Sequence, residues 1–155
     1  MRAATIKGVP AGATQRSWAD ETIDRLLQKG LRNGGARRAV IELLGEQNCC
    51  LSAQDVFDQL RDSGRRVGIA SIYRILELLT AEGAVQRIDL GSGTARFEPI
   101  WPGGHHHHLI CDSCGKVEAF EDRALEHALT RVEKQSGYAV AGHDVALHGA
   151  CSDCV

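Results

Sequence analysis

The sequence predicts an α+β protein with an N-terminal winged helix-turn-helix domain and a smaller C-terminal α+β domain. Three observations carry this prediction. Four segments between residues 17 and 83 repeat apolar side chains at helical spacing. Two short segments of alternating polarity follow, separated by a glycine-bearing turn. Beyond residue 104 the pattern reads strand, strand, helix and strand. Any other small α+β domain is the alternative to the winged helix.

The ends of the four helices are marked as clearly as their apolar faces. The first three are expected at residues 19–29, at 36–44 and from 52 onward, and the fourth at 70–81. Ser17 with Asp20, and Ser52 with Asp55, have the spacing of N-terminal capping boxes. Glycines that can end a helix follow three of them, at Gly30, Gly64 and Gly83.

A β-hairpin is expected after the fourth helix. Its strands cover about residues 85–88 and 95–98, and Leu90-Gly91-Ser92-Gly93-Thr94 separates them. The following segment, PIWPGG, has the composition of a hinge. We therefore divide the chain into a flexible tail (1–16), a winged-helix domain (17–98), a hinge (99–104) and a C-terminal domain (105–155).

The C-terminal domain is small for an independent fold. Strands are expected at residues 106–111, 116–120 and 138–148, with a helix at 122–135. A segment of about fifty residues buries little apolar surface, so a metal ion or a partner subunit is expected to stabilise it.

Charge and hydropathy restrict the classes of function. No stretch approaches the roughly 18 apolar residues of a membrane span, and the N-terminus lacks a signal peptide. We therefore expect a cytoplasmic protein without a membrane partner. Residues 1–104 carry 14 basic and 12 acidic residues, whereas residues 105–155 carry 4 and 8. Any contact with nucleic acid is therefore expected in the first part of the chain.

Cysteine spacing predicts a metal site. Four of the six cysteines form two C-x-x-C pairs, Cys111/Cys114 and Cys151/Cys154. Four thiolates are the usual ligand set of a closed, structural zinc site. The alternative is a pair of redox dithiols, but no thioredoxin-like βαβ pattern surrounds either pair.

Four consecutive histidines, residues 105–108, precede the apolar pair Leu109-Ile110. In a strand His105 and His107 would face one side, and His106 and His108 the other. The run could then supply two ligands to each of two metal sites. A solvated polar run is the alternative.

Catalysis is not expected. Zinc deaminases combine a C-x-x-C with an H-x-E motif, and no histidine here has a glutamate two residues later. Four thiolates would also leave no open position for a substrate. The sequence shows no nucleophile–base pair, so we predict that the protein is not an enzyme.

Three strings resemble the ferric uptake regulator (Fur) family of bacterial metal sensors. They are GIASIYRILELLTAEGAVQR, HHHHLICDSCGKVEAF and HGACSDC, and the resemblance covers about residues 30 to 154. It implies a homodimer that binds double-stranded DNA operators when loaded with metal, and we expect a repressor.

The resemblance also implies roles for single residues. The structural zinc would lie at Cys111, Cys114, Cys151 and Cys154. A regulatory site would use Cys50, Glu98, His106 and His108. A second site on the dimerisation domain would use His105, His107, Glu126 and His143. DNA contacts would come from Arg37, Ser71, Tyr73 and Arg74.

The chain departs from the family pattern in its PIWPGG link, which is longer than in some members, and at three residues. Of these, Cys50 bears on which metal is sensed, and Gly34 on one backbone contact or helix cap. Many members have His where Cys50 stands and Asp where His107 stands, and the usual Thr-x-x-Arg is Gly34-x-x-Arg37. A thiolate at Cys50 favours zinc and a zinc uptake regulator (Zur)-like member, and the alternative for Cys50 is a small buried side chain. The carboxylate of Glu98 leaves iron(II), manganese(II) and peroxide sensing as alternatives. Outside the family, a zinc-storage protein and a zinc hydrolase are the remaining possibilities.

Overall fold

A computed structural model describes residues 17–47, 49–89, 91, 93–101 and 106–155. The chain divides into two compact units, unit 1 (residues 1–104) and unit 2 (residues 105–155). Each unit is described by itself. The predicted tail, His105 and residues 102–104 of the predicted hinge lie outside the described residues.

Unit 1 contains the four predicted helices. They are α1 (Trp18–Gln28), α2 (Gly35–Gly45), α3 (Ala53–Asp62) and α4 (Ile69–Ala81). The Ser52 hydroxyl accepts from the amide of Asp55, and the Asp55 carboxylate accepts from the amide of Ser52 at 2.8 Å, which confirms the capping box of α3. Ser17 likewise accepts from the amide of Asp20 at 3.1 Å.

The apolar faces of these helices form one core. Ile72, Leu76 and Leu79 on α4 are fully buried among residues of α1, α2 and α3. Because Ile72, Leu76 and Leu79 point inward, Tyr73 and Arg74 are left on the exposed side of α4. The core therefore fixes which face of α4 is available to a partner.

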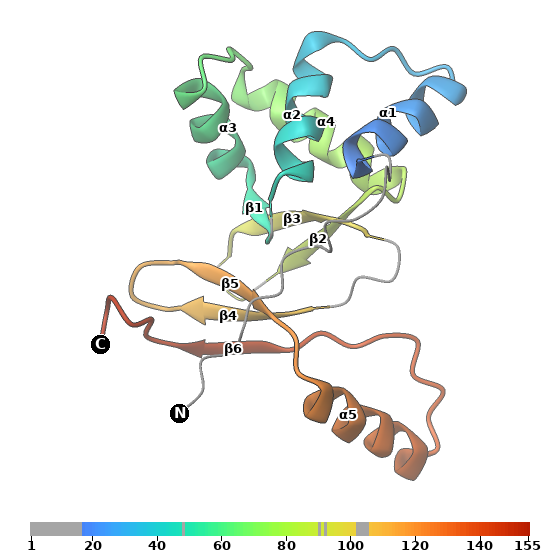
Figure 1. Ribbon diagram of the computed structural model, residues 1–155, viewed down its shortest axis with the longest axis vertical. Helices are drawn as coiled ribbons and strands as arrows, with labels where there is room; N and C mark the ends of the chain where they lie inside the picture. Colours follow the sequence, from blue (N-terminus) through green and yellow to red (C-terminus); the bar gives the residue numbers. More distant parts are fainter. Residues whose placement is uncertain (1–16, 48, 90, 92, 102–105) are drawn as a thin grey trace. The chain divides into compact units, whose positions relative to one another are not determined.

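A three-stranded antiparallel sheet completes unit 1. It consists of β1 (Leu51–Ser52), β2 (Val85–Asp89) and β3 (Ala95–Pro99), in the order β1-β3-β2, and the helices gather on one side of it (Figure 1). The predicted hairpin strands are confirmed. Strand β1 was not predicted, because two residues are too few to show alternation.

Unit 2 contains a second three-stranded sheet and one helix. The elements are β4 (His107–Cys111), β5 (Val117–Phe120), α5 (Arg123–Ser136) and β6 (Ala146–Gly149). The order is β5-β4-β6, with β5 antiparallel and β6 parallel to β4. The helix and the first two strands are confirmed.

The predicted strand at 138–148 is wrong over most of its length, since only Ala146–Gly149 form β6. Residues 138–145 instead return the chain from the end of α5 to the start of β6. A strand that runs parallel to β4 needs such a crossover. Alternating apolar residues such as Tyr138 and Val140 resemble a strand in sequence, but pairing decides the structure.

Helix α5 exposes much of its apolar surface within one chain. None of its residues is buried, although its apolar side chains share a face. Val132, Tyr138, Val140 and Leu147 are likewise exposed in unit 2. None of the helices in the described part of the chain is long and apolar enough to cross a membrane.

Candidate metal centres and DNA-binding surface

The four cysteines of the C-x-x-C pairs meet at one end of the unit 2 sheet. Cys111 ends β4, and Cys151 and Cys154 follow β6. Parallel pairing places Cys111 beside Gly149, so both pairs reach the same end of the sheet. The four sulfurs lie within 4.8 Å of one another, and Cys114 Sγ is 3.7 Å from Cys151 Sγ. Tetrahedral zinc with bonds of about 2.3 Å separates sulfurs by roughly 3.8 Å, so the cluster fits such an ion.

Tight turns hold the sulfurs in this position. The amide of Gly115 donates to the carbonyl of Cys111 at 2.8 Å, and the amide of Cys154 donates to the carbonyl of Cys151 at 2.9 Å. Gly115 has a φ of 74°, which glycine adopts without strain. The amide of Cys151 also donates to Cys111 Sγ at 3.3 Å, linking the two turns.

The thiols of this cluster differ in acidity. Hydrogen bonds from the backbone amides of Cys151 and Cys114 lower the pKa of Cys111 to about 6. The pKa of Cys154 is raised to about 12, because its thiol hydrogen-bonds to Cys151, Cys114 and Cys111. Several thiolates this close repel one another, so a divalent cation is needed to keep all four ionised.

A second cluster lies where β4 faces α5. His107 Nε2 is 2.6 Å from Glu126 Oε1, and His143 Nε2 is 3.3 Å from Glu126 Oε2. The rings of His107 and His143 have centroids 5.4 Å apart. His107 is only 1% exposed and its ring also packs beside Phe120. Two imidazoles around one carboxylate are a suitable ligand set for a metal ion, and His105 lies outside the described residues.

The expected regulatory residues fall in both units, and each half can be described. In unit 2, His106 and His108 are one residue apart on either side of His107, and their rings lie edge to face with centroids 5.2 Å apart. His108 is buried. Two imidazoles so placed can bind one metal ion.

In unit 1, Cys50 and Glu98 are both 3% exposed. Cys50 immediately precedes β1, and Glu98 lies on β3, to which β1 is paired. A hydrogen bond with Cys49, 3.9 Å away, raises the pKa of the Cys50 thiol, and burial and the charge of Glu98 raise it further. Ionising a buried thiol and a buried carboxylate is costly unless a cation compensates their charge, and a bound metal ion would supply that cation.

The sequence did not identify one neighbour of Glu98. Gln86 on β2 lies opposite Glu98 on β3, and its side-chain amide donates to the Glu98 carboxylate. This contact orients the carboxylate of Glu98. The predicted turn at residues 90–94 contained the signal, because a hairpin closed there pairs residue 86 with residue 98.

The expected DNA contacts differ in availability. Tyr73 is 50% exposed, and Arg74 is exposed, with its Nε donating to the carbonyl of Ala70 at 3.2 Å. Ser71 is half-buried on the same helix, α4. The half-buried side chain of Arg37 donates to the carbonyl of Arg32 instead of extending into solvent. Helix α4 therefore offers the more accessible surface.

Comparison with known proteins agrees with this architecture. The sequence profile of the ferric uptake regulator family matches residues 28–148. The ferric uptake regulation protein of Neisseria meningitidis is 33% identical over 85% of this chain and 92% of its own length. That of Bacillus subtilis is 34% identical over 76% and 81%, respectively.

Solved structures agree as well. The ferric uptake regulator of Vibrio cholerae has a TM-score of 0.73 at 29% identity, covering 83% of this chain and 98% of that one. That of Helicobacter pylori, described as having three functional metal binding sites, has a TM-score of 0.75 at 26% identity and covers 88% and 93%. The chain therefore belongs to the ferric uptake regulator family of metal-responsive, DNA-binding transcription regulators.

Proposed function

We propose that this protein is a homodimeric repressor that binds palindromic DNA operators when zinc occupies a regulatory site formed by Cys50, Glu98, His106 and His108. Cys50 and Glu98 would hold the metal from unit 1, and His106 and His108 from unit 2. A bound ion would thereby restrict how the two units move, and with them the two recognition helices of a dimer. Recognition helices must enter major grooves about one helical turn, or a multiple of it, apart.

The observation that carries this proposal is the burial of an acid, a thiol and an imidazole at the expected positions. Glu98, Cys50 and His108 are each no more than 5% exposed. Carboxylates are rarely buried without a compensating partner, and a buried thiol beside one is a suitable ligand for the same ion. A metal ion would satisfy all of them together.

Zinc is favoured by the ligand types. One thiolate, two imidazoles and one carboxylate suit tetrahedral coordination, and the thiolate prefers a softer ion than manganese(II). Iron(II) or manganese(II) is the second candidate, because the relatives above are named ferric uptake regulation proteins. A ferric uptake regulator from Pseudomonas aeruginosa, 27% identical, was also solved with manganese.

The other two clusters complete the proposal. The four cysteines would hold a structural zinc ion, and His107, Glu126 and His143, with His105, would form a second site within unit 2. The description of three metal sites in the Helicobacter pylori relative supports this number.

Dimerisation through unit 2 is supported by its exposed apolar surface. Helix α5 has no buried residue, and Leu147 on β6 is 50% exposed. A monomer would leave this surface in water, whereas a symmetric dimer would bury it.

One titration tests the regulatory site. Purified protein stripped of the regulatory metal would be mixed with a fluorescent operator duplex, and anisotropy followed as zinc, iron(II) or manganese(II) is added at buffered concentrations. We expect zinc to raise DNA affinity at a lower free metal concentration than iron(II) or manganese(II). The increase should be about 5- to 150-fold, the usual range of coupling between sites. DNA binding that is unchanged by every metal and by chelators would contradict metal regulation.

A further inference from the structure

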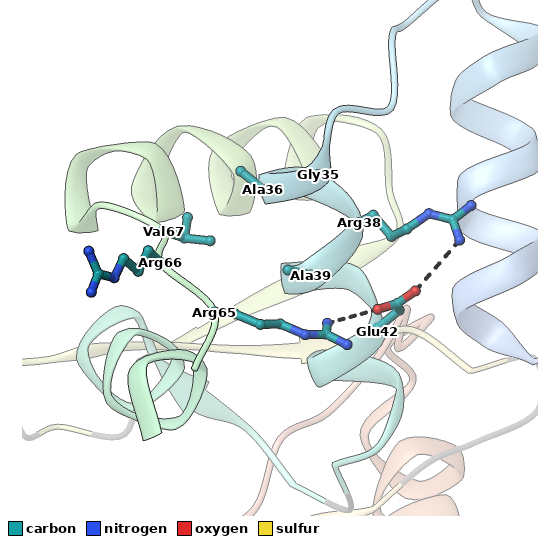
Figure 2. A pocket seen from close by; sticks show the side chains of 8 residues that line it. All are labelled: Gly35, Ala36, Arg38, Ala39, Glu42, Arg65, Arg66 and Val67. Atoms are coloured by element: carbon teal, nitrogen blue, oxygen red, sulfur yellow. Dashed lines mark hydrogen bonds and ion pairs between the residues drawn. The ribbon is translucent and has the colours of Figure 1, made fainter. Parts of the chain in front are cut away.

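A surface pocket in unit 1 is lined by none of the proposed metal ligands. It lies between the start of α2 and the segment that joins α3 to α4, and it has a volume of about 480 Å³ (Figure 2). Its charged lining residues are Arg38 and Glu42 on α2, and Arg65 and Arg66 on the joining segment.

Three arginines around one glutamate leave an excess of positive charge. Glu42 accepts from Arg65 at 2.8 Å and pairs with Arg38 at 3.7 Å. Figure 2 shows Arg66 extending away from Glu42, and no ion pair is recorded for it within the described part of the chain. The side chains of Arg38 and Arg65 are 59% and 48% exposed, so a ligand from solvent can reach them.

The backbone of the pocket adds to its attraction for anions. Helix α2 begins at the pocket with Gly34, which as a glycine has no side chain to cap the first turn. The exposed amides of that turn carry the partial positive charge of a helix N-terminus. This contribution supplements the arginines and would not make a site without them.

The position of the pocket relates it to DNA. Arg65, Arg66 and Val67 lie just before Gly68, the N-cap of α4. In a helix-turn-helix, the recognition helix enters the major groove while the preceding helix crosses the sugar–phosphate backbone. A charged group in the turn between them therefore faces phosphates when α4 reads bases.

We propose that this pocket binds a backbone phosphate of duplex DNA through Arg38, Arg65 and Arg66. Glu42 acts as an internal counter-ion that holds Arg38 and Arg65 in place and competes with the phosphate. The contact is independent of base sequence, and it rests on the proposed function only in requiring that α4 approaches DNA.

Salt dependence of binding to operator and random-sequence duplexes tests the phosphate contact. Loss of one phosphate contact reduces the magnitude of the slope of log K against log salt by about 0.9. The ratio of wild-type to variant affinity therefore changes by about eightfold when the salt concentration changes tenfold. We expect Arg66→Ala to weaken binding to the operator and random-sequence duplexes by a similar, several-fold factor at about 0.1 M salt. It should also reduce the salt dependence of binding to both duplexes. Arg131→Ala, an exposed arginine on α5, is the charge-matched control and should change neither.

Glu42→Gln tests the counter-ion. Removing its charge should strengthen binding to both duplexes and steepen the salt dependence, whereas Glu121→Gln, an exposed glutamate of unit 2, should have little effect. Thermal unfolding of each variant shows that the fold is retained. Calorimetric titration with inorganic phosphate at constant ionic strength measures binding of the free anion.

The outcomes separate this proposal from the function above. If wild type and Arg66→Ala have equal DNA affinities and equal salt dependence, the proposed phosphate contact is wrong, while operator recognition is unaffected. Phosphate binding that Arg66→Ala abolishes, with DNA binding unchanged, assigns the pocket to a free anion and also overturns the proposal. Random and operator duplexes bound equally, with both weakened by Arg66→Ala, support the pocket and contradict operator recognition. Failure to bind any duplex contradicts both.

Discussion

The two units are stabilised in different ways. Unit 1 buries 19 apolar residues in one core, drawn from all four helices and two strands, whereas Ile110 and Cys111 are the only buried residues of that class among the described part of unit 2. Unit 2 instead buries His107 and His108, and gathers four cysteines. A hydrophobic core can stabilise unit 1 alone, while we expect unit 2 to depend on bound ions and a partner chain. The proposed DNA-reading helix thus belongs to the unit with its own core, whereas the proposed metal sites take most of their ligands from the other unit.

The largest expected effect is loss of unit 2 without loss of unit 1. Cys111→Ser should release the structural zinc and unfold unit 2, because such ions contribute on the order of 10 kcal/mol to small folds. Zinc content, sedimentation and heteronuclear NMR of unit 1 signals measure the result. Cys49→Ser, which alters a cysteine outside the cluster, is the control. A Cys111→Ser protein that remains dimeric and equally heat-stable would remove the basis of the comparison.

A core mutation in unit 1 should behave in the opposite way. Leu76 is fully buried, so Leu76→Ala should lower the free energy of unfolding of unit 1 by about 2–5 kcal/mol through lost burial and a cavity. Zinc content should not change. Denaturant unfolding followed by circular dichroism, with zinc measured alongside, checks this; zinc loss at the same denaturant concentration would show that the units unfold together.

DNA recognition should be separable from both kinds of stability. Arg74→Ala and Tyr73→Ala remove exposed side chains of α4, and each should weaken operator binding by about 1–3 kcal/mol, the value of a specific base contact. Anisotropy with operator and random duplexes gives the affinity, and metal analysis and sedimentation serve as controls. Unchanged operator affinity in both variants would rule out α4 as the reading helix.

The last set of substitutions should distinguish the two faces of the histidine run. His108→Ala should abolish the metal dependence of DNA binding, because one of four regulatory ligands is lost. His107→Ala should only reduce dimer stability or shift the responsive concentration range, because its partners Glu126 and His143 lie in unit 2. His106→Ala should follow His108→Ala, and His105→Ala should follow His107→Ala. Equal loss of response at all four positions would indicate one shared cluster.

Local sequence signals predicted unit 1 well. Helix caps such as Ser52 with Asp55 depend on residues three apart, and the bounds of the helices agree to within a residue or two. Strand β1 was missed because its two residues are defined by pairing with Phe97 and Arg96, more than 40 positions away. Propensity and periodicity contain no such long-range information.

The same limit applies to the sites. The C-x-x-C spacing identified the four-cysteine cluster, because the two cysteines of each pair are only three positions apart in the sequence. The pocket around Glu42 was not anticipated, although Arg65 and Arg66 stand out as a basic pair. It depends on a turn 23 residues later folding back onto α2, as the Arg65–Glu42 contact shows.

The parallel pairing of β4 and β6 also sets an order of events during synthesis. β4 acquires its neighbour, and Cys111 and Cys114 acquire their companion sulfurs, only after α5 and residues up to 154 have been made. Unit 1 has all of its core residues by Phe97 and can fold while the rest of the chain is still in the ribosome. A nascent chain can thus have a folded α4, the proposed recognition helix, before it can assemble the four-cysteine cluster. The four-cysteine cluster can therefore assemble only after both units have been translated.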